Sequence, residues 1–269
     1  GGEVMAEPCD VRCDSDVQRL AARVGDKWGD VEILLNVAGV IEVGPFDAMT
    51  MDDFQNSLDV NCWGALRMTR ALLPGMRKRG WGRIGNVASL GGKRAVPHML
   101  PYAVSKFALV GLSHGLRAEL AQEGVLVTTI CPSLMRTGSP RNAIFKGQHR
   151  KEYAWFCIGD SLPMASMDAS LAAQQLLQAV QEGRREVYLR HPMNLGVLAQ
   201  SYLPGLTDEA LALAARVLPA MGGIGRDAAR GYQSESAWAP SWLTSLTQAA
   251  AERYNQLRPR EDLQPPTVS

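Results

Sequence analysis

Short apolar segments that alternate with longer helical segments constrain the fold of this chain more than any other feature. Segments typical of buried strands lie at residues 31–37, 82–88, 125–131 and 186–189. Segments with helical spacing or helix-capping residues lie at 15–28, 51–79, 102–122 and 167–182. In the second helix, Thr50 offers an N-terminal cap and Pro74 should end or kink the helix. Strands that alternate with helices predict an α/β fold with a parallel sheet.

The segment at 138–165 interrupts this alternation. It is polar and carries the aromatic residues Tyr153, Trp155 and Phe156. It is either a lid that covers a substrate or a variable surface loop, and the sequence leaves both interpretations open.

Tyr102 and Lys106 carry the clearest chemical signal. Residues four positions apart lie on one face of a helix, so the phenol and the ammonium group are expected to be neighbours. A free tyrosine titrates near pH ~10, and a neighbouring cation lowers that value because it favours the phenolate. Such a pair can act as a general acid or base on an alcohol or ketone, although an exposed Tyr and Lys on a helix are also common.

Three further motifs precede this pair in the chain. Asn36-Val-Ala-Gly39 follows the first apolar run, and Asn61 lies inside the second predicted helix. Ser89 comes directly after the second predicted strand, thirteen positions before Tyr102. Taken singly, Ser89 could line a strand end and Asn61 could bond the backbone of a bent helix.

In this order and at this spacing, the four elements resemble the short-chain dehydrogenase/reductase family. The resemblance covers about residues 4–137 and, more loosely, 165–190. It implies a Rossmann-like, doubly wound sheet and an NAD(P)-dependent oxidoreductase that interconverts a secondary alcohol and a ketone.

The resemblance also assigns a role to each of the four motif residues. Tyr102 would be the general acid or base, and Ser89 would bond the substrate oxygen and stabilise charge on it. Lys106 would lower the tyrosine pKa and hold the nicotinamide ribose. Asn61 would hold a water molecule that links Lys106 to solvent in a proton relay.

The same resemblance names the residues expected to bind the cofactor, which are Asp10, Val11, Asn36, Val37, Ala38, Gly39, Tyr102, Lys106, Pro132, Met135 and Thr137. Asp10 would accept a hydrogen bond from the adenine amino group. The Met135 backbone and the Thr137 hydroxyl would hold the nicotinamide carboxamide. The choice between NAD and NADP stays open, because the strand that usually decides it is not in this sequence.

The beginning of the chain lacks part of the family pattern. Asp10 and Val11 would close the third strand of the family's sheet, so the first two strands should come before Gly1, in roughly 50 further residues. Those residues would include the glycine-rich turn that seats the pyrophosphate. We therefore expect an N-terminally truncated sheet, and a chain that binds the cofactor poorly by itself and is inactive.

The chain divides into three predicted parts. Residues 1–190 form the truncated Rossmann-like catalytic domain, 191–258 a helical extension packed on it, and 259–269 a disordered tail. The extension contains two apolar helices, at 195–203 and 209–221, both shorter than the ~20 residues that span a bilayer. They could extend a substrate pocket or rest on a membrane surface, but packing on the domain is the expectation.

Composition excludes several other classes of function. A net charge of +1 gives no support for nucleic-acid binding. The five cysteines form no C-x-x-C pair and the four histidines form no cluster, so we predict no metal site. An odd cysteine count without a signal peptide favours reduced thiols and the cytoplasm. By resemblance, the chain would form a homo-oligomer through the helices at 51–79 and 102–122.

Two other functions stay open on the sequence alone. A related lyase or epimerase could use the same Tyr102–Lys106 pair with a tightly held nicotinamide. A non-catalytic fragment that lacks the phosphate-binding turn could act only through its surface. The sequence does not identify the alcohol or ketone, although the apolar C-terminal helices hint at a bulky, apolar substrate.

Overall fold

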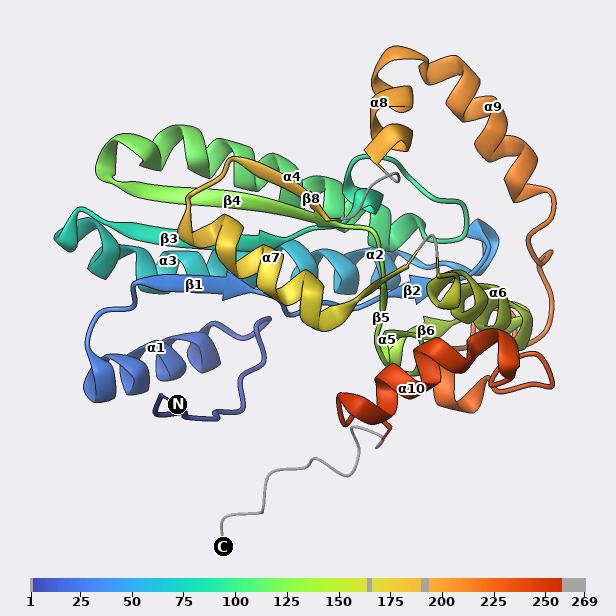
Figure 1. Cartoon of the computed structure of the whole chain (residues 1–269). Coiled ribbons are helices and arrows are strands. Elements are labelled where there is room, and N and C mark those ends of the chain that lie inside the picture. The colour runs from blue at the N-terminus through green and yellow to red at the C-terminus, as the bar shows by residue number, and fades with distance from the viewer. Residues whose placement is uncertain (1, 164–165, 190–193, 258–269) are drawn as a thin grey trace, which may run out of the picture.

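The computed structural model describes residues 2–163, 166–189 and 194–257, and a four-stranded parallel sheet lies at its centre (Figure 1). The strands stand in the order β1 (Ile33–Asn36), β3 (Gly82–Val87), β4 (Val125–Pro132) and β8 (Glu186–Leu189). All neighbouring pairs are parallel, so the carboxyl ends of the strands meet at one edge. The four predicted strands are confirmed, with ends that differ by at most two residues, and so is the α/β fold class.

Helices cover both faces of this sheet. They are α1 (Asp14–Trp28), α2 (Met51–Leu58), α3 (Gly64–Arg79), α4 (Leu100–Leu120) and α7 (Ala169–Gln181). On one face, Ile84 of β3 packs against Met76 of α3 and Leu120 of α4. On the other face, Ile130 of β4 packs against Val180 of α7. Because side chains alternate between the faces of a strand, β1, β3 and β4 each contribute to both clusters, and β8 contributes to the second.

The helix predicted at 51–79 is continuous but contains an irregular turn. α2 and α3 are joined by a π-helical turn at Asp59–Trp63, which the sequence does not predict. The predicted cap is confirmed, because Asp53 Oδ2 accepts hydrogen bonds from the Thr50 nitrogen at 2.6 Å and from its hydroxyl at 2.9 Å. Pro74 does not end the helix, which continues to Arg79. Packing of the buried Met76 against the sheet outweighs the lost backbone hydrogen bond.

The strand expected to end at Asp10 and Val11 is not present in the described residues. Residues 2–10 form an irregular segment that lies along α1. Ion pairs hold it there, with Arg23 Nη1 at 2.8 Å from Glu7 Oε2 and Lys27 Nζ at 2.7 Å from Glu3 Oε1. A strand needs a partner, and no described strand pairs with this segment.

Residues 138–163 of the predicted polar segment form regular elements of the fold. These elements are α5 (Ser139–Asn142), β6 (Ile144–Phe145) and α6 (His149–Ser161). β6 pairs with β2 (Glu42–Val43) and with β9 (Ala229–Arg230) in a small second sheet. β5 (Leu134–Arg136) pairs with β7 (Ser166–Asp168). The aromatic rings of this segment pack together, with Phe145 edge-on to both Tyr153 and Phe156.

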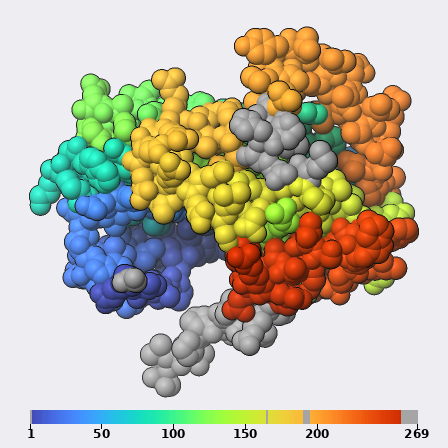
Figure 2. Space-filling view, in the orientation of Figure 1, coloured from blue at the N-terminus to red at the C-terminus, as the bar shows by residue number. Residues whose placement is uncertain are grey.

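The helices of the C-terminal extension differ in how they pack. Its last helix, α10 (Ser245–Arg253), packs against α6, where the Thr247 nitrogen donates a hydrogen bond to Ser161 Oγ at 3.3 Å. By contrast, α8 (Asn194–Tyr202) and α9 (Pro204–Ala215) pack chiefly on each other and project from the molecule, orange in Figures 1 and 2. The predicted packing of these two apolar helices on the domain therefore stays a prediction. More than half of the side-chain surface is exposed at Leu195, Leu198, Leu206, Leu213 and Val217.

The remaining elements are short 3₁₀ turns, at Phe46–Ala48, Leu90–Gly92, Ala121–Glu123, Gly231–Gln233 and Trp242–Thr244. None of the described helices combines the length and apolar character that crossing a bilayer requires. The domain boundary predicted at 190 and the predicted tail at 259–269 lie outside the described residues.

Candidate active site

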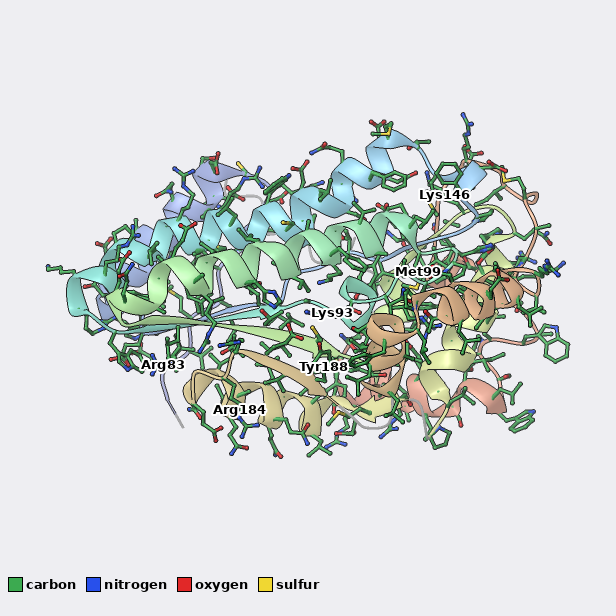
Figure 3. The ribbon with its side chains drawn as sticks, turned by 90° about the horizontal axis from the view of Figure 1, so that it is seen from above. Arg83, Lys93, Met99, Lys146, Arg184 and Tyr188 are labelled. Atoms are coloured by element: carbon green, nitrogen blue, oxygen red, sulfur yellow. The ribbon has the colours of Figure 1, made fainter. Side chains whose placement is uncertain are left out.

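The four motif residues come together at the carboxyl edge of the sheet. Ser89 follows β3, Asn61 lies in the π-helical turn, and Tyr102 and Lys106 lie near the start of α4. Figure 3 shows Met99, just before α4, toward the end of the molecule that carries α6, whereas Arg83 and Arg184 lie at the opposite end. The structure thus brings the four side chains to one edge of the sheet, and their joint catalytic role stays a prediction.

Ser89 is held beside Tyr102 by a tight turn. Its hydroxyl accepts a hydrogen bond from the Gly91 nitrogen at 3.0 Å and forms another with the Tyr102 side chain. Glycines are needed in this turn: a Cβ on Gly92 would lie 2.6 Å from the carbonyl oxygen of Lys106. The absence of side chains at this point lets the turn pack directly on α4.

Burial dominates the electrostatics of the Tyr102–Lys106 pair. Loss of water raises the pKa of Tyr102 to about 12, and the hydrogen bond from Ser89 opposes that rise. Lys106 is only 5 % exposed, and burial lowers its pKa to about 8. Its Nζ lies 5.6 Å from the centre of the Tyr102 ring and donates a hydrogen bond to the Val87 carbonyl at 2.8 Å. Burial is the largest of the causes that set the Tyr102 pKa, and the role expected of Lys106, to lower that pKa, stays a prediction.

Asn61 joins two parts of the site. Its Oδ1 accepts a hydrogen bond from the Val40 nitrogen at 2.8 Å, and its Nδ2 donates to the Val40 carbonyl at 3.0 Å. The same Nδ2 donates to Ser105 Oγ at 2.8 Å. The loop after β1 is thus tied to α4 through one buried amide. Both amide protons are used, so a water molecule bound by Asn61 would have to donate to Oδ1 or to a backbone carbonyl.

The residues after β1 line the same edge. Asn36 ends the strand, and its Nδ2 donates to Asn86 Oδ1 at 2.8 Å. Val37, Ala38 and Gly39 are exposed. A Cβ on Gly39 would lie 3.1 Å from Asn61 Oδ1 and 3.7 Å from Lys106 Nζ, so this glycine leaves open the space next to Lys106.

The residues after β4 continue this edge. Pro132 is buried at the end of β4, and Met135 lies in β5, opposite Met167 of β7. The Thr137 hydroxyl donates to Ser139 Oγ at 2.7 Å. The Met135 backbone is therefore partly engaged in a strand, and the Thr137 hydroxyl already has one partner.

Asp10 and Val11 differ from the other cofactor candidates. Asp10 is exposed and pairs with Arg12, Nη2 to Oδ2 at 2.7 Å, and these hydrogen bonds lower its pKa. Val11 contacts Gly64, where a Cβ would lie 2.7 Å from Val11 Cγ2. The described contacts connect Val11 to the helix that carries Asn61, and they connect Asp10 to Arg12 and to Asp16 of α1.

The sequence analysis missed a third ionisable group near this pair. Asp160 of α6 is 5 % exposed, and its charge acts on Tyr102, raising the pKa of the phenol. Burial raises the pKa of Asp160 itself to about 8. A signal was available, because Glu152, Phe156 and Asp160 follow each other at intervals of four on one helix face.

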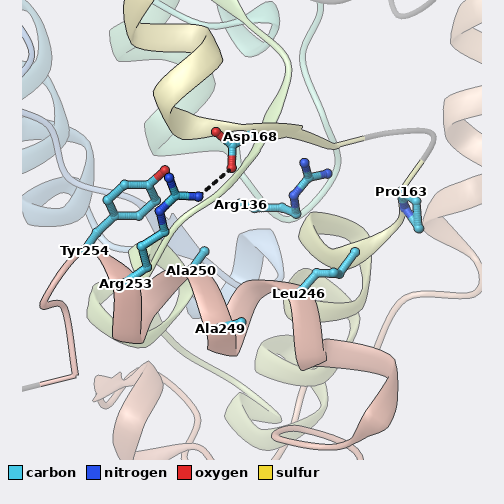
Figure 4. Close-up of a pocket in the computed structure, with 8 residues that line it drawn as sticks. All are labelled: Arg136, Pro163, Asp168, Leu246, Ala249, Ala250, Arg253 and Tyr254. Atoms are coloured by element: carbon cyan, nitrogen blue, oxygen red, sulfur yellow. Dashed lines mark ion pairs between the residues drawn. The ribbon is translucent and has the colours of Figure 1, made fainter.

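A cavity of about 640 Å³ lies beside the segment that contains Met135 and Thr137 (Figure 4). Arg136, Asp168, Arg253 and Tyr254 contribute its polar lining, and Arg253 Nη1 lies 3.8 Å from Asp168 Oδ2. None of the four motif residues lines it. Among the described residues, no group of three His, Cys, Asp or Glu side chains is placed to bind a metal ion.

Comparison with known proteins places the sequence in a family context. A family model described as short chain dehydrogenase matches residues 1–144. The ketoacyl reductase HetN of a Nostoc species is 37% identical over 132 residues, which cover 49% of this chain and 46% of the relative. The D-beta-hydroxybutyrate dehydrogenase of Rhizobium meliloti is 34% identical over 136 residues, covering 51% of this chain and 53% of the relative. The chain spans about half the length of these curated relatives.

Solved structures give the same context for the fold. A short-chain dehydrogenase from Streptomyces avermitilis matches with a TM-score of 0.59 and 28% identity, over 78% of each chain. A gluconate 5-dehydrogenase from Burkholderia cenocepacia, crystallised with NADP and tartrate, matches with a TM-score of 0.56 and 24% identity. It covers 67% of this chain and 71% of its own, and at that identity the likeness concerns the fold.

Proposed function

This chain belongs to the short-chain dehydrogenase family, and from that membership we propose that it carries the catalytic part of an NAD(P)-dependent oxidoreductase. The reaction is the interconversion of a secondary alcohol and a ketone. The observation that supports this proposal best is the junction of Ser89, Tyr102 and Lys106, where a strand end meets the start of a helix.

The residues around Lys106 fit the nicotinamide half of the cofactor. Gly39 leaves the space beside Lys106 open, and the Lys106 ammonium donates one of its three protons to Val87. Two protons remain for the hydroxyls of a ribose. Asn36–Gly39 and Pro132–Thr137 flank this position and would hold the rest of the nicotinamide half, with Asp10 and Val11 toward the adenine. When bound, the nicotinamide supplies or accepts the hydride.

Tyr102 is suited to donate a proton. With a pKa of about 12 it keeps its proton at neutral pH, so it can pass that proton to the oxygen of a ketone as charge develops there. Ser89 would bond the same oxygen, which orients the substrate and stabilises the developing charge. Lys106, with a pKa of about 8, would be mostly protonated at pH 7 and would favour reprotonation of the phenolate.

We assign Asn61 to the path by which protons would reach Lys106 from solvent. Its side chain fixes the loop after β1 against α4, and the π-helical turn beside it interrupts the normal helical bonding. A backbone carbonyl freed in such a turn is a site for the water molecule that would link Lys106 to solvent.

We extend the proposal to the assembly and location of the protein. Trp63, Val104 and Phe107 are exposed apolar residues on the helices through which we expect two copies to pair. A homo-oligomer in the cytoplasm remains our prediction, and size-exclusion chromatography with light scattering would test the assembly.

The substitution Tyr102→Phe tests the function. In the protein that carries this chain, it should lower kcat for ketone reduction by at least ~10², because only the phenolic proton is removed. The change in NADH or NADPH absorbance measures the rate, and thermal unfolding provides the control for folding. Near wild-type turnover in the Phe variant would refute the role of Tyr102. A lyase or epimerase would instead convert substrate without a net change in cofactor redox state.

A further inference from the structure

We propose that Asp160 belongs to the substrate site, where its carboxyl group hydrogen-bonds a hydroxyl or carbonyl oxygen of the substrate other than the reacting one. The inference rests on the proposed function and adds a substrate class to it: secondary alcohols and ketones that carry a second neutral oxygen group. α6, which carries Asp160, is attached to the segment that leads into α4.

Glu152 anchors the first turn of α6. It is completely buried, and its Oε1 lies 2.8 Å from Nδ1 of His98, in the segment that leads into α4. Its Oε2 accepts a hydrogen bond from Trp155 Nε1 at 2.6 Å. His98 has a left-handed backbone with φ of 64°, which costs energy for a non-glycine residue. The strained residue therefore lies where α6 is attached to the segment that leads into α4.

The next turn of α6 strengthens the attachment. Phe156 and Cys157 are buried in a cluster against which Met99 packs, and Met99 directly precedes α4. Glu152 and Phe156 are separated by four positions, so the same face of α6 makes both contacts. Asp160 is the next residue at this spacing, and its charge acts on Tyr102. The face that carries Asp160 is thus directed toward the start of α4.

Asp160 differs from the other buried acidic residues in having no partner within the part of the chain that the structure describes. Glu42 accepts a hydrogen bond from Asn56 Nδ2 at 2.8 Å, and Glu152 has the two partners given above. Among residues 2–163, 166–189 and 194–257, no hydrogen bond or ion pair to the Asp160 carboxyl is found. A buried polar group without a partner destabilises a fold, and such features persist mainly where function requires them.

The protonation state of the Asp160 carboxyl group determines which ligands it can hydrogen-bond. With a pKa of about 8, Asp160 is mostly uncharged at pH 7 and can both donate and accept a hydrogen bond. That capacity matches a hydroxyl or a carbonyl oxygen. A cation would require the charged carboxylate, which burial disfavours. A substrate hydroxyl beside the reacting group therefore fits this position better than an ammonium group.

The test compares matched ketones in matched variants. The probes are cyclohexanone with its α-hydroxy derivative, and butanone with acetoin. The variants are Asp160→Leu, which removes the hydrogen bond, and Asp160→Asn, which keeps a neutral donor and acceptor. Asp208→Asn, on the exposed side of α9, is the control.

We expect Asp160→Leu to lower the preference for the hydroxylated ketone, which is the ratio of its kcat/KM to that of the plain ketone, by ~10-fold or more. Asp160→Asn and Asp208→Asn should keep most of the preference. An unchanged preference in the Leu variant would overturn the role of Asp160, while leaving the reductase function intact. Thermal unfolding checks that each variant is folded.

Binding separates this inference from the proposed function. If the wild-type protein reduces neither ketone with NADH or NADPH, the proposed function fails for these substrates, and calorimetric titration with the hydroxylated ketones then decides the role of Asp160. Binding at least ~10-fold weaker in Asp160→Leu than in wild type supports the inference. Equal affinities, or no binding to the wild type, refute it.

Discussion

Burial shifts the pKa of Tyr102, Lys106 and Asp160 toward the uncharged form of each group. The pKa of Tyr102 rises to about 12, that of Lys106 falls to about 8, and that of Asp160 rises to about 8. Burial thus keeps the phenol of Tyr102 and the carboxyl group of Asp160 protonated at neutral pH. Two predictions at the scale of single residues follow from this site.

The first concerns the pH dependence of stability. An unfolded Asp160 loses its proton near pH ~3.9, whereas the folded carboxyl keeps it up to about pH 8. Between these values the folded state binds more protons, so the stabilisation that this proton provides is complete below about pH 4 and is lost as the pH rises through 8. Wild-type stability relative to Asp160→Leu should therefore fall by up to ~1.4 kcal/mol per pH unit across this range.

Urea unfolding at intervals between about pH 4 and pH 8 measures this difference. Tyr102 and Cys157 interact electrostatically with Asp160, but burial raises the pKa of each to about 12. Neither group therefore titrates in this pH range, and neither contributes to the measured pH dependence. Parallel stability curves for the wild type and Asp160→Leu would contradict the shift.

The second prediction concerns Gly92. A Cβ at this position would lie 2.6 Å from the Lys106 carbonyl oxygen and 2.8 Å from its carbonyl carbon, so backbone would have to move. Gly92→Ala should destabilise the protein by ~1–3 kcal/mol and lower activity, because it displaces Lys106. Gly111→Ala in α4 is the matched control, since no atom lies within 4 Å of its added Cβ. That control should be neutral or stabilising by up to ~1 kcal/mol. Equal melting temperatures for both variants would refute the close contact.

At the scale of secondary-structure elements, the contact that fixes the position of α6 is its attachment to the segment before α4. Glu152→Ala leaves both His98 and Trp155 without their buried partner, and we expect a loss of ~2–4 kcal/mol in unfolding free energy. Lys151→Ala, on the adjacent exposed position, is the control.

Hydrogen exchange should locate the effect of Glu152→Ala. Amides of α6 should exchange faster in this variant, whereas those of β3 and β4 should keep their relative protection. Faster exchange spread equally over the sheet would mean that Glu152 supports the whole domain and not this attachment.

The same elements show what the sequence could predict. The strands at 82–87 and 125–132 are short and largely buried, and local signals in the sequence mark their limits. The approach of Ser89 to Tyr102 follows from a strand end and a helix start. The placement of α6 does not, because it depends on His98 and Glu152, which are 54 positions apart. The π-helical turn is likewise unpredictable from local signals, although Asn61 inside it bonds Val40 from 21 positions away.

At the scale of the whole molecule, the α8–α9 hairpin differs from the rest of the fold. Its apolar residues have helical spacing, which predicts burial, but the described domain covers few of them. Combined substitution of Leu198, Leu206 and Leu213 by Gln should therefore change the unfolding free energy by less than ~0.5 kcal/mol per site. Leu120→Gln, at a buried position, is the contrasting control and should be strongly destabilising.

Differential scanning calorimetry of both variants makes this comparison, with light scattering to follow aggregation. The hairpin variant should also scatter less light on heating, because fewer apolar side chains are exposed. A drop in melting temperature as large as that of Leu120→Gln would show that the hairpin is buried in the protein in solution.

The parallel order of the central sheet also bears on how the protein reaches its native state. Every strand pair joins residues more than forty positions apart, as with Gly82 and Val125, or Thr129 and Glu186. Closing such long loops costs chain entropy before any pairing is gained, so folding of this topology is slow compared with that of helical bundles. Ser89, Tyr102 and Lys106 meet only where these distant strands have already paired. During refolding of the protein that carries this chain, recovery of the proposed oxidoreductase turnover should therefore lag behind recovery of helical content.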